Sequence, residues 1–208
     1  TFYHKGGGVG QTPDYWNNDY QDDIYFRNGE PEESNGYCTD VFFDEAISFI
    51  NKNKENPFLC FLSLNAPHSP FNVPKEYYEL YENEIDLLES QKRFYGMITN
   101  IDDNFGRLHQ HVESLGILDN TIIIFTTDNG TSNGYKYSRK DKKWLGFNAG
   151  MRGTKTSEYD GGHRVPFIIK WKKGGLFGGH NYSGLSAHVD MLPTLLSFAK
   201  IAFNSTKK

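Results

Sequence analysis

Apolar runs and helical periodicities alternate along the chain and predict its elements. Runs rich in β-branched and aromatic residues, each followed by polar residues, predict three buried strands at 58–64, 122–127 and 165–171. Apolar residues spaced three or four apart predict helices at 39–52, 75–82, 88–115 and 190–200. Thr39 is the expected N-cap of the first helix, and Gly116 the expected stop of the third. The alternation predicts an α/β sandwich, with a mainly parallel central sheet flanked by helices.

The remaining stretches lack periodicity and predict loops. Residues 1–36 are rich in Gly, Asn, Asp and Pro and predict an irregular loop region. A polar loop is expected at 130–160 and a Gly-rich loop or hairpin at 174–184. The pair Asp102-Asp103 lies inside the long predicted helix, where neighbouring side chains diverge by roughly 100°. A solvated helix face is therefore favoured for this pair over a metal site.

The strand at 122–127 ends in Asp128-Asn129-Gly130. Ligand sites of open α/β sheets lie just beyond the carboxyl ends of strands. Asp128 and Asn129 offer oxygen donors, which hard cations such as Ca²⁺ and Mg²⁺ prefer. Asn-Gly is also a common turn sequence, and because turns are far commoner than metal sites, the local pattern alone favours an ordinary turn.

Three sequence blocks carry distinctive motifs. The strand at 58–64 is followed by Ala-Pro-His, ending at His68, and the strand at 122–127 ends in the motif Thr-Asp-Asn-Gly, which runs to Gly130. The third block, 150–166, reads Gly-Met-Arg-Gly-Thr-Lys, then Tyr-Asp-Gly-Gly-His-Arg-Val-Pro. Taken together, the three blocks resemble the sulfatase family of the alkaline phosphatase superfamily, and the helix at 190–200 also resembles the one after that family's last large loop. The resemblance covers about residues 36–201, and the blocks are specific only in combination.

The resemblance implies hydrolysis of sulfate esters, with sulfated carbohydrates as the expected substrates. His68 and Lys155 match the family's catalytic, sulfate-binding residues: His68 would protonate the leaving alcohol, and Lys155 would bind the sulfate. Asp128 and Asn129 match its metal ligands, with Ca²⁺ expected and Mg²⁺ less favoured. Related phosphodiesterases carry Asp-His at this point, because imidazole suits Zn²⁺ or Mn²⁺. Asn129 therefore favours a sulfatase.

The family's nucleophile is a formylglycine made from the first residue of Cys/Ser-x-Pro-x-Arg, and that motif is absent here. The chain is therefore expected to be part of a single sulfatase catalytic domain, with residues 37–201 forming part of its α/β core. The N-terminal part and a C-terminal subdomain would be missing, and the fragment alone would be inactive. The full-length protein would need a formylglycine-generating or sulfatase-maturing enzyme. A periplasmic or secreted location is suspected from the family.

The sequence leaves two other functions open. The first is a phosphodiesterase or phosphonate hydrolase of the same superfamily. The second is a non-catalytic, ligand-binding pseudoenzyme, which an absent nucleophile would also fit.

Charge and composition limit the classes of partner that the chain is expected to bind. A net charge of −4 with scattered basic residues gives no sign of nucleic-acid binding. No apolar stretch is long enough for a membrane span. Short basic runs at 139–140, 142–143 and 172–173 are interpreted as solvated loop charge. Cys60, inside a predicted strand, is expected to be a buried thiol.

Overall fold

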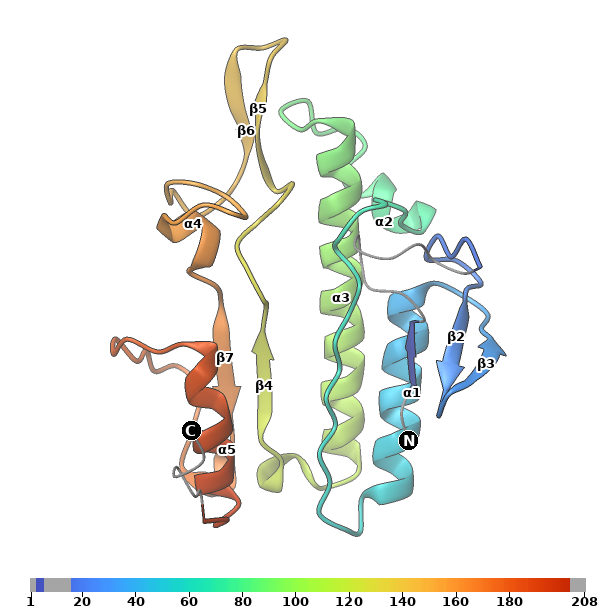
Figure 1. Cartoon of the computed structure of the whole chain (residues 1–208), viewed down its shortest axis with the longest axis vertical. Helices are drawn as coiled ribbons and strands as arrows, with labels where there is room; N and C mark the ends of the chain where they lie inside the picture. Colours follow the sequence, from blue (N-terminus) through green and yellow to red (C-terminus); the bar gives the residue numbers. More distant parts are fainter. Residues whose placement is uncertain (1–2, 6–15, 203–208) are drawn as a thin grey trace. The chain divides into compact units, whose positions relative to one another are not determined.

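The computed structural model describes residues 3–5 and 16–202 of the 208-residue chain. The chain divides into two compact units, Thr1–Leu176 and Phe177–Lys208. Every predicted site residue lies in the first unit. Figure 1 shows the elements of the chain coloured along the sequence.

Two long helices form the frame of the first unit (Figure 1). Helix α1, Cys38–Asn53, packs against α3, Glu89–Ser114, and the short α2, Lys75–Glu79, also contacts α3. Near the start of α1, Asp40 accepts hydrogen bonds from the Nδ2 atoms of Asn100 (2.9 Å) and Asn104 (2.6 Å). Near its end, Asn51 bonds His111 at 2.9 Å. The two helices therefore run in the same direction.

The apolar core lies around Met97 of α3, which is 0% exposed. The cluster comprises Tyr20, Tyr25, Tyr37, Cys38, Phe42, Ala66 and Met97. It joins the N-terminal region, α1 and α3, so the helical periodicities identified the correct faces. Helix α3 ends as predicted before Gly116, whose φ of +71° suits glycine. The predicted cap at Thr39 is wrong, because α1 begins one residue earlier and has Tyr37 as its N-cap.

The sheets of the described residues differ from the predicted mainly parallel sheet. Strand β4, Ile123–Thr126, pairs antiparallel with β7, Phe167–Lys170, in the register Ile124↔Ile169. The other two sheets are also antiparallel. One comprises β1 (Tyr3–Lys5), β2 (Ile24–Arg27) and β3 (Glu30–Glu33). The other is the hairpin of β5 (Tyr135–Ser138) and β6 (Lys143–Gly146). The loop expected throughout 1–36 is therefore wrong for β2 and β3, and the loop at 130–160 contains a hairpin.

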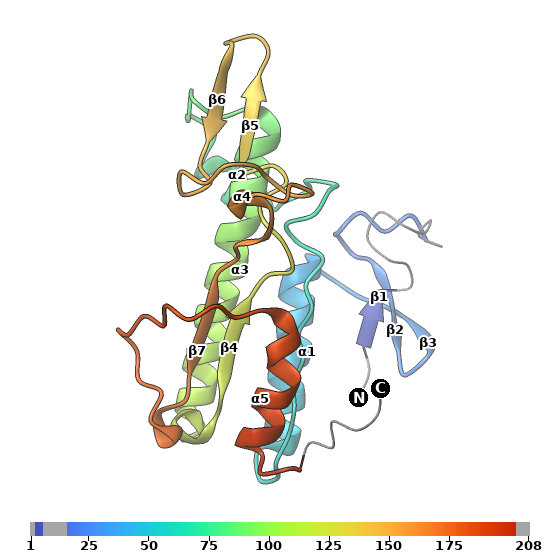
Figure 2. The same cartoon turned by 60° about the vertical axis from the view of Figure 1, so that its left-hand side comes forward.

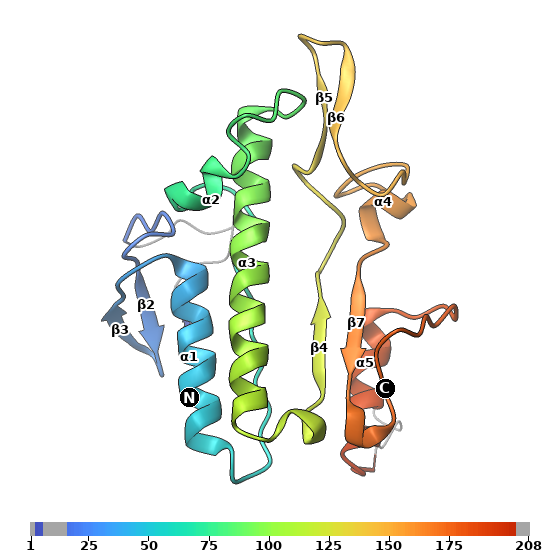
Figure 3. The same ribbon diagram turned by 180° about the vertical axis from the view of Figure 1, so that it is seen from behind.

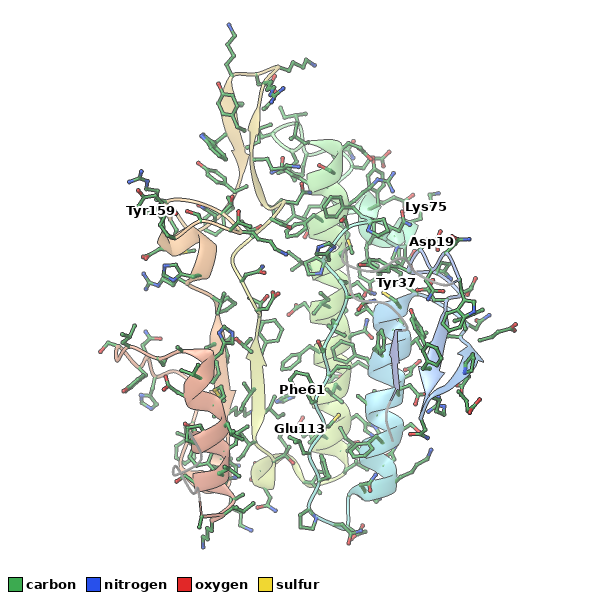
Figure 4. All side chains as sticks on the ribbon, viewed as in Figure 1. Asp19, Tyr37, Phe61, Lys75, Glu113 and Tyr159 are labelled. Carbon is green, nitrogen blue, oxygen red and sulfur yellow. The ribbon has the colours of Figure 1, made fainter. Side chains whose placement is uncertain are left out.

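The predicted strand at 58–64 is extended but has no ladder partner among the described residues. Leu62 and Leu64 pack against the core cluster, whereas Phe61 (labelled in Figure 4) is 86% exposed. Cys60 is also exposed, so the prediction of a buried thiol is wrong. The segment has the apolar character of a buried strand without the neighbouring strands that would bury it.

This segment and β4 run in the same direction. Phe58 contacts Phe49 near the end of α1, and Phe71 contacts Phe94 near the start of α3. The segment therefore runs antiparallel to the two helices. Strand β4 does the same, since it follows the end of α3 through the short helix η1, Leu118–Asn120 (Figures 1 and 3). The carboxyl ends of both stretches thus lie toward the N-terminal end of α3.

The first unit also contains α4, Asp160–His163, and η2, Lys172–Gly174. The second unit contains η3, His188–Asp190, and α5, Met191–Phe198. Helix α5 confirms the helix predicted at 190–200, with a shorter span. None of the helices in the described part of the chain is both long and apolar enough to cross a membrane.

Candidate active site

The turn after β4 presents two oxygen-bearing side chains. Asp128 is exposed and Asn129 is half-buried. The Nδ2 atom of Asn129 donates to the carbonyl of Gly130 at 3.0 Å. No hydrogen bond of the described residues uses the Oδ1 atom of Asn129, so this oxygen is available to a ligand. The turn interpretation and the metal-ligand interpretation are therefore compatible here.

Backbone contacts between glycines fix this turn in place. The amide of Gly130 donates to the carbonyl of Gly162 at 2.9 Å, and that of Gly161 to Arg152 at 2.8 Å. A Cβ atom on Gly130 would lie 1.9 Å from the carbonyl oxygen of Gly161. No side chain fits between the two segments, so the glycines of the 150–166 block are needed for close backbone approach.

Lys155 lies beside the same turn. Its amide donates to the carbonyl of Thr131 at 2.9 Å, and Thr131 is two residues beyond Asn129. The side chain of Lys155 is half-buried. The structure therefore brings the backbones of the predicted sulfate-binding residue and the predicted metal ligands together, although the hairpin separates them in sequence.

His68 follows the extended segment at 58–64. Its Nδ1 atom lies 2.9 Å from the carbonyl oxygen of Ser69. A carbonyl oxygen can only accept, so this contact is a hydrogen bond in the tautomer that carries its proton on Nδ1, and Nε2 is then the other ring nitrogen open to a ligand. The backbone carbonyl of His68 accepts a hydrogen bond from the hydroxyl of Tyr20 at 3.2 Å. The core cluster thus supports the loop that carries His68.

The loops carrying His68 and Asp128 converge on Phe94, near the start of α3. Phe71, three residues after His68, contacts Phe94 edge-to-face, with ring centroids 6.1 Å apart. A Cβ on Gly134, in the chain that follows Asp128, would lie 3.1 Å from the Phe94 ring. Both loops therefore pass close to the N-terminal part of α3. No hydrogen bond of the described residues joins His68 to Asp128, Asn129 or Lys155.

Two arginines of the 150–166 block are held by local contacts. The guanidinium carbon of Arg152 lies 3.6 Å from the ring centroid of Tyr159, which is labelled in Figure 4. Arg164 pairs with Asp160 at 3.5 Å. Both pairs shape the loop around Lys155.

The oxygen donors of Asp128 and Asn129 fit part of the coordination shell of a hard cation. Across 3–5 and 16–202, no group of three or more His, Cys, Asp or Glu side chains is arranged to hold a metal. Two donors do not complete a calcium site, so further ligands from outside these residues would be needed.

The chain belongs to the sulfatase family, whose model matches residues 2–201. It is 31% identical over 186 residues to the uncharacterized sulfatase YdeN of Escherichia coli K12, covering 88% of this chain and 31% of YdeN. It is 29% identical to an arylsulfatase of Clostridium perfringens, covering 82% of this chain and 40% of that protein. The chain therefore spans well under half the length of these curated relatives.

Solved structures show the same fold. The structure of Ps i-CgsB matches with a TM-score of 0.75 at 28% identity, covering 88% of this chain and 38% of that one. The same protein, in complex with k-i-k-neocarrahexaose, matches with a TM-score of 0.73. The predicted alkaline phosphatase-like fold is thus supported by the match to sulfatase structures, while the sheets of this chain are small and antiparallel.

Proposed function

We propose that the complete protein is a calcium-dependent, formylglycine-type sulfatase that hydrolyses sulfate esters of carbohydrates. The main support within the chain is the fixed loop that brings Lys155 beside the Asp128-Asn129 turn. Relatives that act on carbohydrates add to it. One is the ulvan-active sulfatase of Formosa agariphila, 26% identical over 90% of this chain and 39% of that protein. Another is Ps i-CgsB, solved with a neocarrahexaose.

Each residue of the proposed site has a chemical role that suits sulfate-ester cleavage. Lys155 places an ammonium against the sulfate, where negative charge shifts toward the leaving oxygen. His68, when protonated, donates a proton to the leaving alcohol. Asp128 and Asn129 would hold Ca²⁺, which supplies positive charge to the sulfate oxygens when bound. The nucleophile is not among these residues, since the chain lacks the formylglycine motif.

A phosphodiesterase or phosphonate hydrolase is the principal alternative. Those enzymes need metals that accept nitrogen ligands, and the turn here offers an amide oxygen instead. A non-catalytic pseudoenzyme is less favoured, because His68, Lys155 and the Asp128-Asn129 pair, the residues of this chain proposed to bind sulfate and calcium, are all present.

The test compares paired substrates on the complete protein, matured with its formylglycine. Aryl sulfate, aryl phosphate and bis-aryl phosphate are assayed with calcium, with manganese and with a chelator. We expect calcium-dependent turnover of the sulfate, at least about 100-fold faster than of either phosphate. The purified 208-residue chain is the control, and it should be inactive. Preferred turnover of a phosphate ester, or no turnover of any ester, would overturn the proposal.

A further inference from the structure

The hairpin β5–β6, residues 135–146, is the most basic segment of the first unit. We call it the basic hairpin. Its residues 136–143 contain five of the 22 basic residues of the chain and one acidic residue, although the whole chain carries −4. Figures 1 and 2 show the basic hairpin extending away from the packed helices of this unit.

One face of the basic hairpin carries three aromatic side chains. Tyr137 and Trp144 are opposite each other in the strand register, and their rings meet edge-to-face at 5.8 Å. Tyr135 stacks on Trp144 at 4.8 Å, with an angle of 14° between the rings. Tyr137 is 49% exposed and Trp144 is 53% exposed. The result is an accessible aromatic platform.

The opposite face attaches the basic hairpin to the rest of the unit. Ser138 and Leu145 are buried. Gln91 of α3 donates to the carbonyl of Leu145 at 2.9 Å, and Lys143 pairs with Asp86 at 2.7 Å. With one face anchored, the aromatic platform is held in a fixed orientation, which lowers the entropy cost of binding.

Most of the positive charge on the basic hairpin has no counter-ion. No ion pair of the described residues involves Lys136, Arg139, Lys140 or Lys142. The single acid, Asp141, accepts a hydrogen bond from Ser138 at 2.6 Å and so shapes the turn. Three of these cations, Arg139, Lys140 and Lys142, lie in the turn that joins the two strands, whereas Lys136 is opposite Leu145 on the other face. The three turn cations at the end of the aromatic surface form a site for a polyanion with apolar ring faces.

The basic hairpin also starts and ends at the proposed active site. Its base is closed by hydrogen bonds from Phe147 to Gly134 (2.8 Å) and from Lys155 to Thr131 (2.9 Å). Tyr137 lies six positions after Thr131, which is about 20 Å at most in an extended strand. One oligosaccharide is therefore long enough to contact both the proposed site and the platform.

We propose that the basic hairpin binds the part of a sulfated polysaccharide that extends beyond the ester being cleaved. Sugar rings pack on Tyr137 and Trp144, and further sulfate groups pair with the unpartnered cations. This inference rests on the proposed function, because it assumes that the active site takes a sulfated carbohydrate. It identifies an extended polyanionic chain, rather than a small sulfate ester, as the preferred substrate.

The test measures kinetics of the complete protein on an aryl sulfate and on a sulfated oligosaccharide of at least six sugars. Arg139→Gln/Lys140→Gln should raise KM for the oligosaccharide by about 3- to 10-fold, as expected for exposed charge pairs. The kcat of this double variant for the oligosaccharide, and its kcat and KM for the aryl sulfate, should stay unchanged. The control Lys52→Gln/Lys54→Gln removes the same charge from exposed positions at the C-terminal end of α1 and should leave every constant unchanged.

A second pair of variants tests the aromatic platform. Tyr137→Ala should raise KM for the oligosaccharide by about 3-fold or more through lost apolar contact. Tyr182→Ala, at an exposed tyrosine of the second unit, is the control and should have no effect. Competition with a single-stranded oligonucleotide of equal charge tests nucleic acid as the alternative ligand, since bases also stack on aromatic rings.

The outcomes separate this inference from the proposed function. Lack of aryl sulfate turnover by the parent protein overturns the proposed function and this inference with it. Aryl sulfate turnover with an oligosaccharide KM that neither hairpin variant changes overturns only this inference. Tighter binding of the oligonucleotide than of the oligosaccharide also overturns it.

Discussion

The core around Met97 and the loops from Thr127 to Arg164 are built in different ways. The core joins α1, α3 and the N-terminal region through buried aromatic and apolar side chains. The loops depend on backbone hydrogen bonds and on glycines that approach one another too closely for any side chain. Stability is therefore expected to reside in the first region and chemistry in the second, so that substitutions should separate the two.

Replacing Asp128 by Ala in the complete protein is expected to give the largest effect on activity. The change removes the only anionic metal ligand that we propose in this chain, so kcat/KM for an aryl sulfate should fall by about 10³-fold or more. Asp128 is exposed, so the free energy of unfolding should change by less than about 0.5 kcal/mol. Activity titrated with calcium and urea unfolding measure the two quantities.

Asp102→Ala is the matched control, because Asp102 is an exposed aspartate on α3. It should leave both activity and calcium dependence unchanged. Full activity of Asp128→Ala with an unaltered calcium requirement would contradict the proposed metal ligand.

The two regions also differ in how far the sequence predicted them. The helices were predicted well, since the spacing of residues such as Phe94 and Met97 is a direct consequence of one face packing inward. The site residues were chosen by motif alone, and their roles stay predictions; the structure adds that the backbone of Lys155 bonds that of Thr131.

Sheet pairing could not be predicted in the same way. Apolar runs look alike in parallel and antiparallel strands, so the apolar pattern does not indicate that β4 pairs antiparallel with β7. The basic hairpin was also missed. Its strand alternates exposed Tyr137 with buried Ser138, and such an alternation indicates a strand. The many charged residues around it, however, are typical of a loop.

A substitution in the core should have the opposite effect to Asp128→Ala: it should lower stability and leave activity unchanged. Met97→Ala leaves a cavity in a fully buried site and should lower the free energy of unfolding of the chain by about 2–5 kcal/mol. Ile98→Ala, at the neighbouring residue that is 40% exposed, should cost clearly less. In the complete protein, Met97→Ala should retain the parent kcat per folded molecule. Urea unfolding and activity at low temperature measure these effects, and loss of kcat in a folded Met97→Ala protein would show that the two regions are not separable.

Alkaline pH should also destabilise the core, by less than Met97→Ala does. Burial raises the pKa of the Cys38 thiol from 9.0 to about 12, and burial also raises the pKa values of Tyr20 and Tyr37. A raised pKa means that the folded chain keeps a proton that the unfolded chain loses. The resulting stability is complete below pH 9 and is lost as the pH rises toward 12. The free energy of unfolding should therefore fall above pH 9 by on the order of 1 kcal/mol per pH unit.

Cys38→Ala removes one of these groups and should reduce the slope between pH 9 and 11 in urea titrations. A parent slope of zero over that range would show that the folded core does not protect these protons.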